Sequence, residues 1–237
     1  MKKLMILLAA LLIAMPGLMA QTYRNNIAFD ESTDFSFGKD PFTFEALSYF
    51  GWGAHMPTNE MKEAQSKALN SEFFLNIIEM RARLYQNGLL TLGVDWDRDC
   101  YRLDKHYFWM PMSSLKHVEI VPAGSLRIRK SNLVVHTFSF PMGFEHRAGE
   151  WVIRFGGALD YNLPAKTRVK AESPHGDRTR DITKGIPTRT LTYHLTAALS
   201  YGGLGLYARY NPIPQFEEGV GPQYRAITFG LIWGLGM

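Results

Sequence analysis

The sequence is poor in cysteine: its 237 residues contain only Cys100. One cysteine cannot form a disulfide within the chain, and no cluster of cysteine and histidine has the spacing of a zinc site. Many exported domains depend on disulfides, so their absence points to another source of stability, of which closure of a β-barrel is one. The sequence therefore predicts no bound metal and no cofactor.

Long apolar runs are also rare. The run Leu4–Met15 is too short to cross a bilayer as a helix, and no other is longer. Lys2 and Lys3 precede it, and Leu18–Ala20 ends it with a small residue before Gln21. Basic, apolar and then small residues are typical of a secretory signal peptide, so we expect residues 1–20 to be removed after Ala20. A buried N-terminal helix, the alternative, is disfavoured by the two lysines.

Net charge is low as well. The formal charge is +4, of which the two lysines of the expected signal peptide contribute two. This is too little positive charge to indicate a nucleic-acid partner. Hydrophobic residues make up 46% of the chain, enough for one large domain. We expect that domain over residues 42–237, preceded by a flexible, polar periplasmic segment over residues 21–41.

What the sequence does contain is alternation with a period of two. From residue 73 to 97, even-numbered positions are mostly apolar and odd-numbered positions are mostly polar or charged, which is typical of strands with two unlike faces. Because the apolar positions are even-numbered on both strands, the residue numbers of a facing pair must add up to an even number. A three-residue loop, Gln86–Gly88, meets this condition, and we expect Gly88 in the left-handed conformation. In that register Leu84 lies opposite Leu90, and Arg81 lies diagonal to Asp95.

The same alternation recurs along the chain and predicts eight strands. We expect them near residues 44–55, 73–85, 89–97, 132–147, 151–162, 190–201, 204–210 and 226–237. The facing of the first strand stays open, and Pro57–Asn70 has a helical pattern. Turns at Ala148–Gly149 and Gly202–Gly203 are short, with Phe144 expected to face Ile153, whereas Arg98–Ser131 and Leu163–Pro187 are long.

An even number of strands with alternately short and long connections predicts an all-β fold, an eight-stranded antiparallel transmembrane β-barrel with short periplasmic turns and long extracellular loops. Aromatic residues are expected at both edges of its apolar band. The outer edge would hold Trp96, Tyr161, Tyr193 and Tyr210, and the inner edge Trp151, Tyr201 and Trp233.

Charged residues with the inward-facing parity are the candidate site. They are Glu79, Arg81, Arg83, Asp95, Glu145 and Arg154, and Asp97, His194 and Arg209 share the same parity. An eight-stranded barrel is only wide enough for side chains, so we expect a packed ionic core. A proton relay or a ligand site is the alternative, but buried charges need mutual pairing in any case.

Nucleophile patterns are weak. Ser139 and His194 share the inward parity, but their spacing shows no orienting carboxylate. We therefore assign no catalytic residue and expect a protein that is not an enzyme.

Two stretches resemble a known family. KSNLVVHTFSFPMGFEHR over residues 130–147 and ALSYGGLGLYARYNPIPQF over residues 198–216, with a last strand ending at the C-terminus, resemble the small outer-membrane β-barrel proteins of the Bacteroidetes, the PorT-like group. This resemblance implies location in the outer membrane and recognition of the last strand by the barrel-assembly machinery. By analogy alone it also implies an accessory role in protein secretion.

The long segments are the better functional candidates. Arg98–Ser131 and Leu163–Pro187 both have an excess of lysine and arginine over acidic residues and are expected above the outer leaflet. We expect a structural or interaction protein whose loops contact lipopolysaccharide or a protein partner. A plain solvated surface, a secretion accessory and a lipid-A-modifying enzyme are the alternatives.

Overall fold

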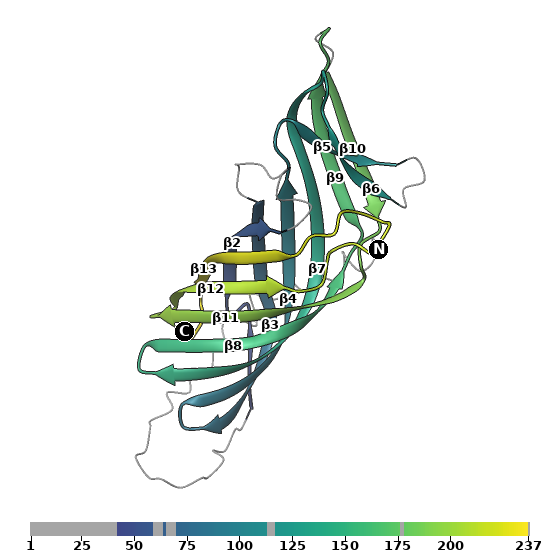
Figure 1. Cartoon of the computed structure of the whole chain (residues 1–237). Helices are drawn as coiled ribbons and strands as arrows, with labels where there is room; N and C mark the ends of the chain where they lie inside the picture. The colour runs from purple at the N-terminus through teal and green to yellow at the C-terminus, as the bar shows by residue number, and fades with distance from the viewer. Residues whose placement is uncertain (1–41, 59–63, 65–69, 113–116, 176–177, 237) are drawn as a thin grey trace, which may run out of the picture. The chain divides into compact units, whose positions relative to one another are not determined.

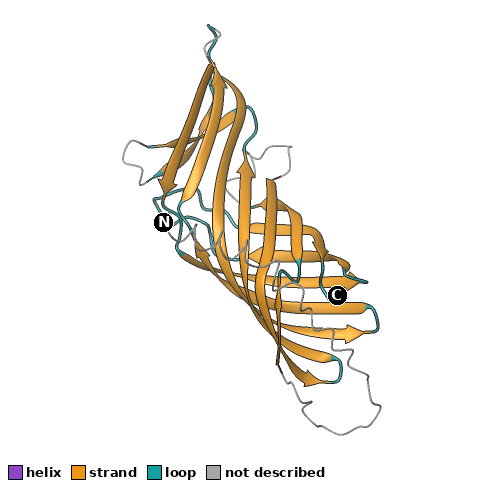
Figure 2. Cartoon of the chain, turned by 180° about the vertical axis from the view of Figure 1, so that it is seen from behind, coloured by secondary structure: helices purple, strands orange, loops and turns teal. Residues whose placement is uncertain are grey.

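The structure is a computed structural model that describes residues 42–58, 64, 70–112, 117–175 and 178–236. The expected signal peptide, the segment 21–41, most of the helix expected over Pro57–Asn70, and Met237 lie outside the described residues. Strands and connecting loops make up the described part, with no α-helix (Figure 2). None of the residues described thus belongs to a helix long and apolar enough to cross a bilayer.

Eight antiparallel strands form a closed ring (Figure 1). Each pairs with the next, and the last pairs with the first across the β13–β2 seam. The strands are β2 (Phe50–Pro57), β3 (Asn70–Tyr85), β4 (Gly88–Arg102), β7 (Arg127–Ala148), β8 (Trp151–Asn162), β11 (Leu191–Tyr201), β12 (Leu204–Asn211) and β13 (Ala226–Trp233). The predicted eight-stranded antiparallel transmembrane barrel is confirmed. We call its two ends the turn side, with the short connections, and the loop side, with the long ones.

Five further strands lie outside this ring. Strand β1 (Phe42–Ala46) pairs with the part of β3 that extends past its pairing with β2. The extended backbone conformation is interrupted between β1 and β2 at Leu47, which has a φ of 53°. On the loop side, β9 (Ala165–Glu172) pairs with both β7 and β10 (Arg178–Ile186). Strands β5 (Tyr107–Pro111) and β6 (Val118–Pro122) form a separate hairpin.

The connections Arg98–Ser131 and Leu163–Pro187 are long, as predicted, but they contain strands that were not predicted. Strand β9 does alternate, with Lys166, Arg168 and Lys170 on one face. Its other face is buried but consists of small residues, such as Ala165 and Ala171. The buried face has no large apolar side chain, so the period of two was not recognised as a strand.

The β3–β4 register also differs from the prediction. The turn is Gln86–Asn87, and Gly88 already belongs to β4 without a positive φ. Ala82, and not Leu84, therefore lies opposite Leu90. A Cβ at Gly88 would collide with the ring of Tyr85, so a larger residue here would displace that exposed side chain. The glycine serves close packing across the hairpin instead of a left-handed turn.

The β7–β8 turn is two residues long, as predicted, but lies one residue later, at Gly149–Glu150. Gly149 takes the left-handed conformation with a φ of 61°, which glycine adopts at no steric cost. Phe144 consequently faces Phe155 instead of Ile153. The turn at Gly202–Gly203 lies where it was predicted.

The outer surface of the ring is apolar. Phe50, Trp52 and Met56 point outward while His55 is buried, which settles the facing of the first strand. Aromatic side chains meet near the turn side, where the Trp151 and Tyr201 rings lie 5.0 Å apart and Phe50 stacks on Trp233 at 5.5 Å. The other outward apolar residues include Ile78, Leu90, Leu92, Phe140, Met142, Ile153, Phe155, Leu159, Tyr161, Tyr193, Leu195, Leu199, Leu206, Phe229 and Leu231.

Buried apolar clusters lie toward both ends of the lumen. The turn-side plug consists of Tyr49, Phe74, Val152, Ala198, Tyr207, Ile232 and Leu235. The loop-side cap consists of Ala64, Tyr101, Leu103, Trp109, Val118, Leu133, Val135, Ala165, Ile186, Phe216 and Tyr224. Arg209 lies over the Phe74 ring of the plug and His55 stacks on Tyr101 of the cap, so these lumenal polar side chains lie between the two clusters.

Leu92→Arg is expected to lower the free energy of unfolding in lipid vesicles by about 2–4 kcal/mol, because it exposes a charge to mid-membrane lipid. Leu126→Arg makes the same change at a leucine exposed to a similar extent in the β6–β7 turn, and should cost much less. Equal losses in urea titrations of the two variants would contradict the assignment of the apolar face to lipid.

Candidate functional site

The turn-side lumen holds four of the six predicted site residues in one ionic network. Glu79 Oε1 lies 2.7 Å from Arg81 Nε and 2.7 Å from Arg154 Nη2. Arg154 Nη2 also lies 3.0 Å from Glu145 Oε2. Arg154 and Glu145 are directly opposite each other on β7 and β8, which explains their contact. Arg83 is only half-buried and forms no ion pair with any described residue.

Two further residues complete this network. Glu45 of β1 lies 2.6 Å from Arg81 Nη1, and Arg147 Nε donates a 2.7 Å hydrogen bond to Glu145. The network thus contains three carboxylates and three guanidinium groups and is electrically balanced. Sequence reasoning missed Glu45 because it did not resolve the facing of the first strand.

Asp95 does not belong to this network, and its predicted pairing with Arg81 is wrong. Because of the observed register, Arg81 lies opposite Thr91 and Asp95 lies opposite Asn76. A bulge between Asn76 and Ile78 shifts the register once more between the two positions. Asp95 instead accepts hydrogen bonds from Asn76 Nδ2 at 2.8 Å and from the Tyr49 hydroxyl at 3.3 Å.

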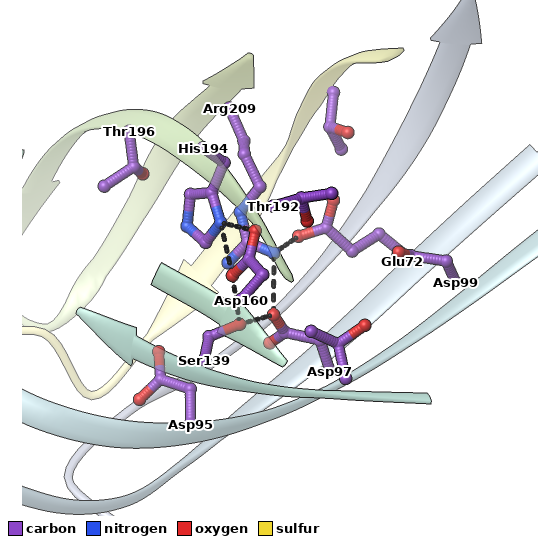
Figure 3. A network of polar contacts seen from close by, with 12 residues as sticks. Glu72, Asp95, Asp97, Asp99, Ser139, Asp160, Thr192, His194, Thr196 and Arg209 are labelled. Carbon is purple, nitrogen blue, oxygen red and sulfur yellow. Dashed lines mark hydrogen bonds and ion pairs between the residues drawn. The ribbon is translucent and has the colours of Figure 1, made fainter. Parts of the chain in front are cut away.

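A second network fills the lumen nearer the loop side (Figure 3). Arg209 Nη1 lies 2.6 Å from Glu72 Oε1 and 3.1 Å from Asp97 Oδ2. The Ser139 hydroxyl lies 2.6 Å from Asp97 Oδ2 and 2.7 Å from Asp160 Oδ1. A hydroxyl has one proton and can donate it to only one of these carboxylates at a time.

His194 belongs to this second network and does have an orienting carboxylate. Its Nδ1 lies 2.9 Å from Asp160 Oδ2 (Figure 3). Asp160 lies directly opposite Ser139, a relation that only the correct β7–β8 register reveals. Ser139 therefore contacts two carboxylates and not the imidazole, so the geometry does not show a serine activated by a histidine base.

Above the ring, the sheet formed by β7, β9 and β10 has a strongly cationic face. Arg180, Lys170 and Lys130 lie directly opposite one another across the three strands, as do Lys184 and Lys166. Residues directly opposite in a sheet share a face. We call this surface, with its continuation on β4, the cationic face; it comprises Arg98, Arg102, Lys130, Lys166, Arg168, Lys170, Arg178, Arg180 and Lys184.

The reverse face of the same sheet is covered. Ile128 and Ala171 pack with Ala123 and Phe108, which belong to the β5–β6 hairpin and the turn after it. Leu133 packs with Trp109, which is completely buried. The sheet is therefore amphipathic: its apolar side packs on the β5–β6 hairpin, whereas no described residue forms an apolar cluster on its cationic side.

Glu172 is the only carboxylate that the described residues place on the cationic face. It lies 2.7 Å from Arg129 Nη2 and 3.6 Å from Arg178 Nε. The hydrogen bond from Arg129 lowers the pKa of Glu172 below its ordinary value. Apart from Arg178, the cations of this face have no carboxylate partner among the described residues.

The cationic face continues directly from the apolar band. The pairs Trp96–Phe138 and Phe138–Tyr161 form the last aromatic row on β4, β7 and β8. The next row toward the loop side pairs Arg98 with His136, whose ring stacks on Trp96 at 5.5 Å. Cationic side chains thus begin where the expected bilayer interface ends.

A histidine connects two loop-side segments. His117 Nδ1 lies 2.6 Å from the Gly219 carbonyl oxygen, and its Nε2 lies 2.7 Å from Glu119 Oε1. Both partners are acceptors, so both ring nitrogens must donate and the imidazolium is the form that fits. The Glu119 hydrogen bond is the main cause that raises the pKa of His117 above its ordinary value.

Comparison with known proteins gives a limited picture. No protein-family model and no curated protein matches the sequence. Several solved structures match in fold, including the following two. Ail, the attachment invasion locus protein of Yersinia pestis, solved with the heparin analogue sucrose octasulfate, has 12% identity and a TM-score of 0.34, covering 81% of this chain and 94% of Ail. Neisserial surface protein A has 11% identity and a TM-score of 0.40, covering 82% and 97%. At these values neither protein assigns a function to this chain.

A double-mutant cycle tests the turn-side network. Glu79→Gln is expected to cost about 3–5 kcal/mol of stability in lipid vesicles, because it leaves Arg81 and Arg154 without their shared carboxylate. Glu79→Gln and Arg81→Met should be strongly coupled, whereas Asp95→Asn and Arg81→Met should be additive. Additivity of Glu79→Gln with Arg81→Met, together with strong coupling of Asp95→Asn with Arg81→Met, would instead support the register predicted from sequence.

The His117 contact predicts a pH dependence. A raised pKa means that this interaction stabilises the folded chain fully below pH 6.5 and that the contribution is lost as pH rises through the folded-state value. An NMR titration of the His117 ring should show the raised pKa, and Glu119→Gln should lower it. Amide exchange at Val118, whose N–H donates a 2.8 Å hydrogen bond to the Val220 carbonyl oxygen, should quicken above the transition. An unshifted titration in both proteins would contradict the contact.

Proposed function

We propose that this protein is a non-enzymatic outer-membrane barrel that binds anionic groups of lipopolysaccharide through its cationic face. The proposal rests on a difference in ion pairing between the arginines of the lumen and the cations of the cationic face. The deeply buried arginines of the lumen contact carboxylates, whereas most cations of the cationic face have no such partner among the described residues. Exposed, unpaired cations in an ordered row attract anions from outside the chain.

The position of the cationic face supports a lipid partner. It follows directly on the Trp96–Phe138–Tyr161 row, so its cations stand at the level of head groups just above the bilayer. In lipopolysaccharide, phosphate and carboxylate groups occupy this level. Each lysine or arginine close to an anionic membrane surface contributes about 1 kcal/mol to binding, and a sheet fixes several of them at regular spacing.

The remaining assignments of the proposal rest on sequence. Residues 1–20 act as the signal peptide, residues 21–41 form a periplasmic segment, and residues 42–237 form the barrel. The last strand is recognised by the barrel-assembly machinery, as the PorT-like resemblance implies. The arrangement of Ser139, between two carboxylates and away from His194, supports a binding role over lipid modification.

The test compares two variants with equal loss of charge. Lys170→Gln with Arg180→Gln removes two neighbouring cations of the cationic face, and Lys105→Gln with Arg225→Gln removes two exposed cations elsewhere on the loop side. Binding of the detergent-solubilised protein to lipopolysaccharide should fall at least about tenfold for the first pair and little for the second. Affinity of the unmodified protein should also fall as salt rises.

Two results would contradict the proposal. Equal losses for the two variants would mean that general charge, and not the cationic face, attracts the lipid. Unchanged affinity for lipopolysaccharide in the Lys170/Arg180 variant, with loss of a protein that co-purifies with the unmodified barrel, would assign the face to a protein partner.

A further inference from the structure

The lumen contains a compact group of potential metal ligands in the loop-side half. His55, Glu72 and Asp99 come from the adjacent strands β2, β3 and β4, and all three are buried. Each offers one ligand atom, and these atoms lie within 4.8 Å of one another. The three residues are separated in sequence and come together only through the barrel register, so their spacing gave no indication of a metal site.

The contacts of these residues leave part of the group unsatisfied. His55 Nε2 lies 3.0 Å from Asp99 Oδ1, and His55 Nδ1 lies 2.7 Å from Thr228 Oγ1. Glu72 is 1% exposed, and its Oε2 accepts no hydrogen bond from a described residue. Its Oε1 lies beside Arg209, but its Oε2 has only His55 Nδ1 near it, at 3.7 Å. Glu72 Oε2 thus points into the group without a donor.

Charge is the second, independent observation. The turn-side network is balanced, but the described loop-side lumen is not. Its buried carboxylates number five, against one arginine and two histidines, so an excess of two negative charges remains even when both histidines are protonated. The carboxylates are Glu72, Asp95, Asp97, Asp99 and Asp160, and the cations are Arg209, His55 and His194. An unbalanced charge buried in a low-dielectric interior is costly, so the network calls for a further cation.

We infer that His55, Glu72 and Asp99 bind one divalent metal ion of the zinc class. An imidazole with two carboxylates is a donor set that suits Zn²⁺, whereas Mg²⁺ and Ca²⁺ prefer oxygen ligands. Zinc bonds of about 2.1 Å hold tetrahedral donors about 3.4 Å apart, which small side-chain rotations reach from the present separations. A water molecule takes the fourth position, because Thr228 and Asp99 contact opposite nitrogens of the His55 ring.

The ion also improves the charge balance. It replaces the proton of His55, and it reduces the excess to one negative charge. Asp95 accommodates that charge, because Asn76 Nδ2 and the Tyr49 hydroxyl donate hydrogen bonds to it. Apolar clusters lie toward both ends of the lumen, so the metal enters while the barrel folds and exchanges slowly afterwards.

The experiment uses the tag-free chain, refolded from urea into detergent micelles with ZnCl₂, MgCl₂, CaCl₂ or a chelator, and then freed of loose metal by gel filtration. Elemental analysis should find about one zinc ion per folded chain and background levels of the other two metals. Chelator added after folding should remove the zinc slowly. The apparent Tm should be higher after refolding with zinc than after refolding with chelator.

Variants locate the site. His55→Gln and Asp99→Asn should reduce bound zinc to background and abolish the difference in Tm. His194→Gln is the matched control, because His194 is also a buried lumenal histidine beside a carboxylate but lies outside the group. Heat-modifiable gel mobility verifies that each variant has folded.

Several results would overturn the inference. One is a folded, unmodified barrel that carries no zinc and shows the infrared band of protonated carboxyl groups, because protons would then balance the charge. Binding of magnesium or calcium in place of zinc would contradict the assigned donor chemistry. Loss of zinc in folded His194→Gln, with retention in folded His55→Gln, would move the site to another part of the lumen.

Discussion

The need to neutralise charge inside a closed barrel is the constraint on which the rest of this structure depends. An eight-stranded ring leaves room only for side chains, and the period of a strand directs every second residue inward. Arg154 illustrates the consequence: it meets Glu79 from across the lumen and Glu145 from the adjacent strand. A slip of one residue on any of these strands would turn a charge toward lipid and leave its partner unpaired.

Outside the lumen the same residue types follow a different rule. Lys170 and Arg180 lie opposite each other and repel, an arrangement that only access to water or to external anions makes tolerable. The sheet remains ordered because its reverse face packs through Ile128 and Leu133 on the β5–β6 hairpin. Apolar packing on one side thus holds an unfavourable array of cations on the other. Such an array has a physical rationale when an anionic surface lies next to it.

The sequence was sufficient for the faces of the barrel strands, because alternation between Phe140 or Leu159 and their polar neighbours is strong. It was not sufficient for register. Register depends on bulges, such as the one between Asn76 and Ile78, and on turns, and neither leaves a reliable trace in hydropathy. The predicted contact between Arg81 and Asp95 failed for that reason.

Predicted pairs therefore differ in how well they withstand an error in register. The expected pairing of Phe144 with Ile153 placed Glu145 diagonal to Arg154, and the two residues are directly opposite. Their contact forms all the same, because both positions lie within reach of an arginine. Register-dependent groups could not be predicted at all. Asp160 meets Ser139 and His194 only in the observed alignment, and Glu72 and Asp99 meet His55 only across two strand pairs.

His55 also lies at the point where closure of the ring is decided. Strand β2 is the first barrel strand and β13 the last, so the ring closes only when these two ends of the sequence pair. The 2.7 Å contact between His55 and Thr228 crosses that seam. Asp99 of β4 and Glu72 of β3 lie beside the same imidazole of His55. A ligand group centred on His55 would couple the seam to the neighbouring strands. Charge balance and barrel closure would then depend on the same side chain.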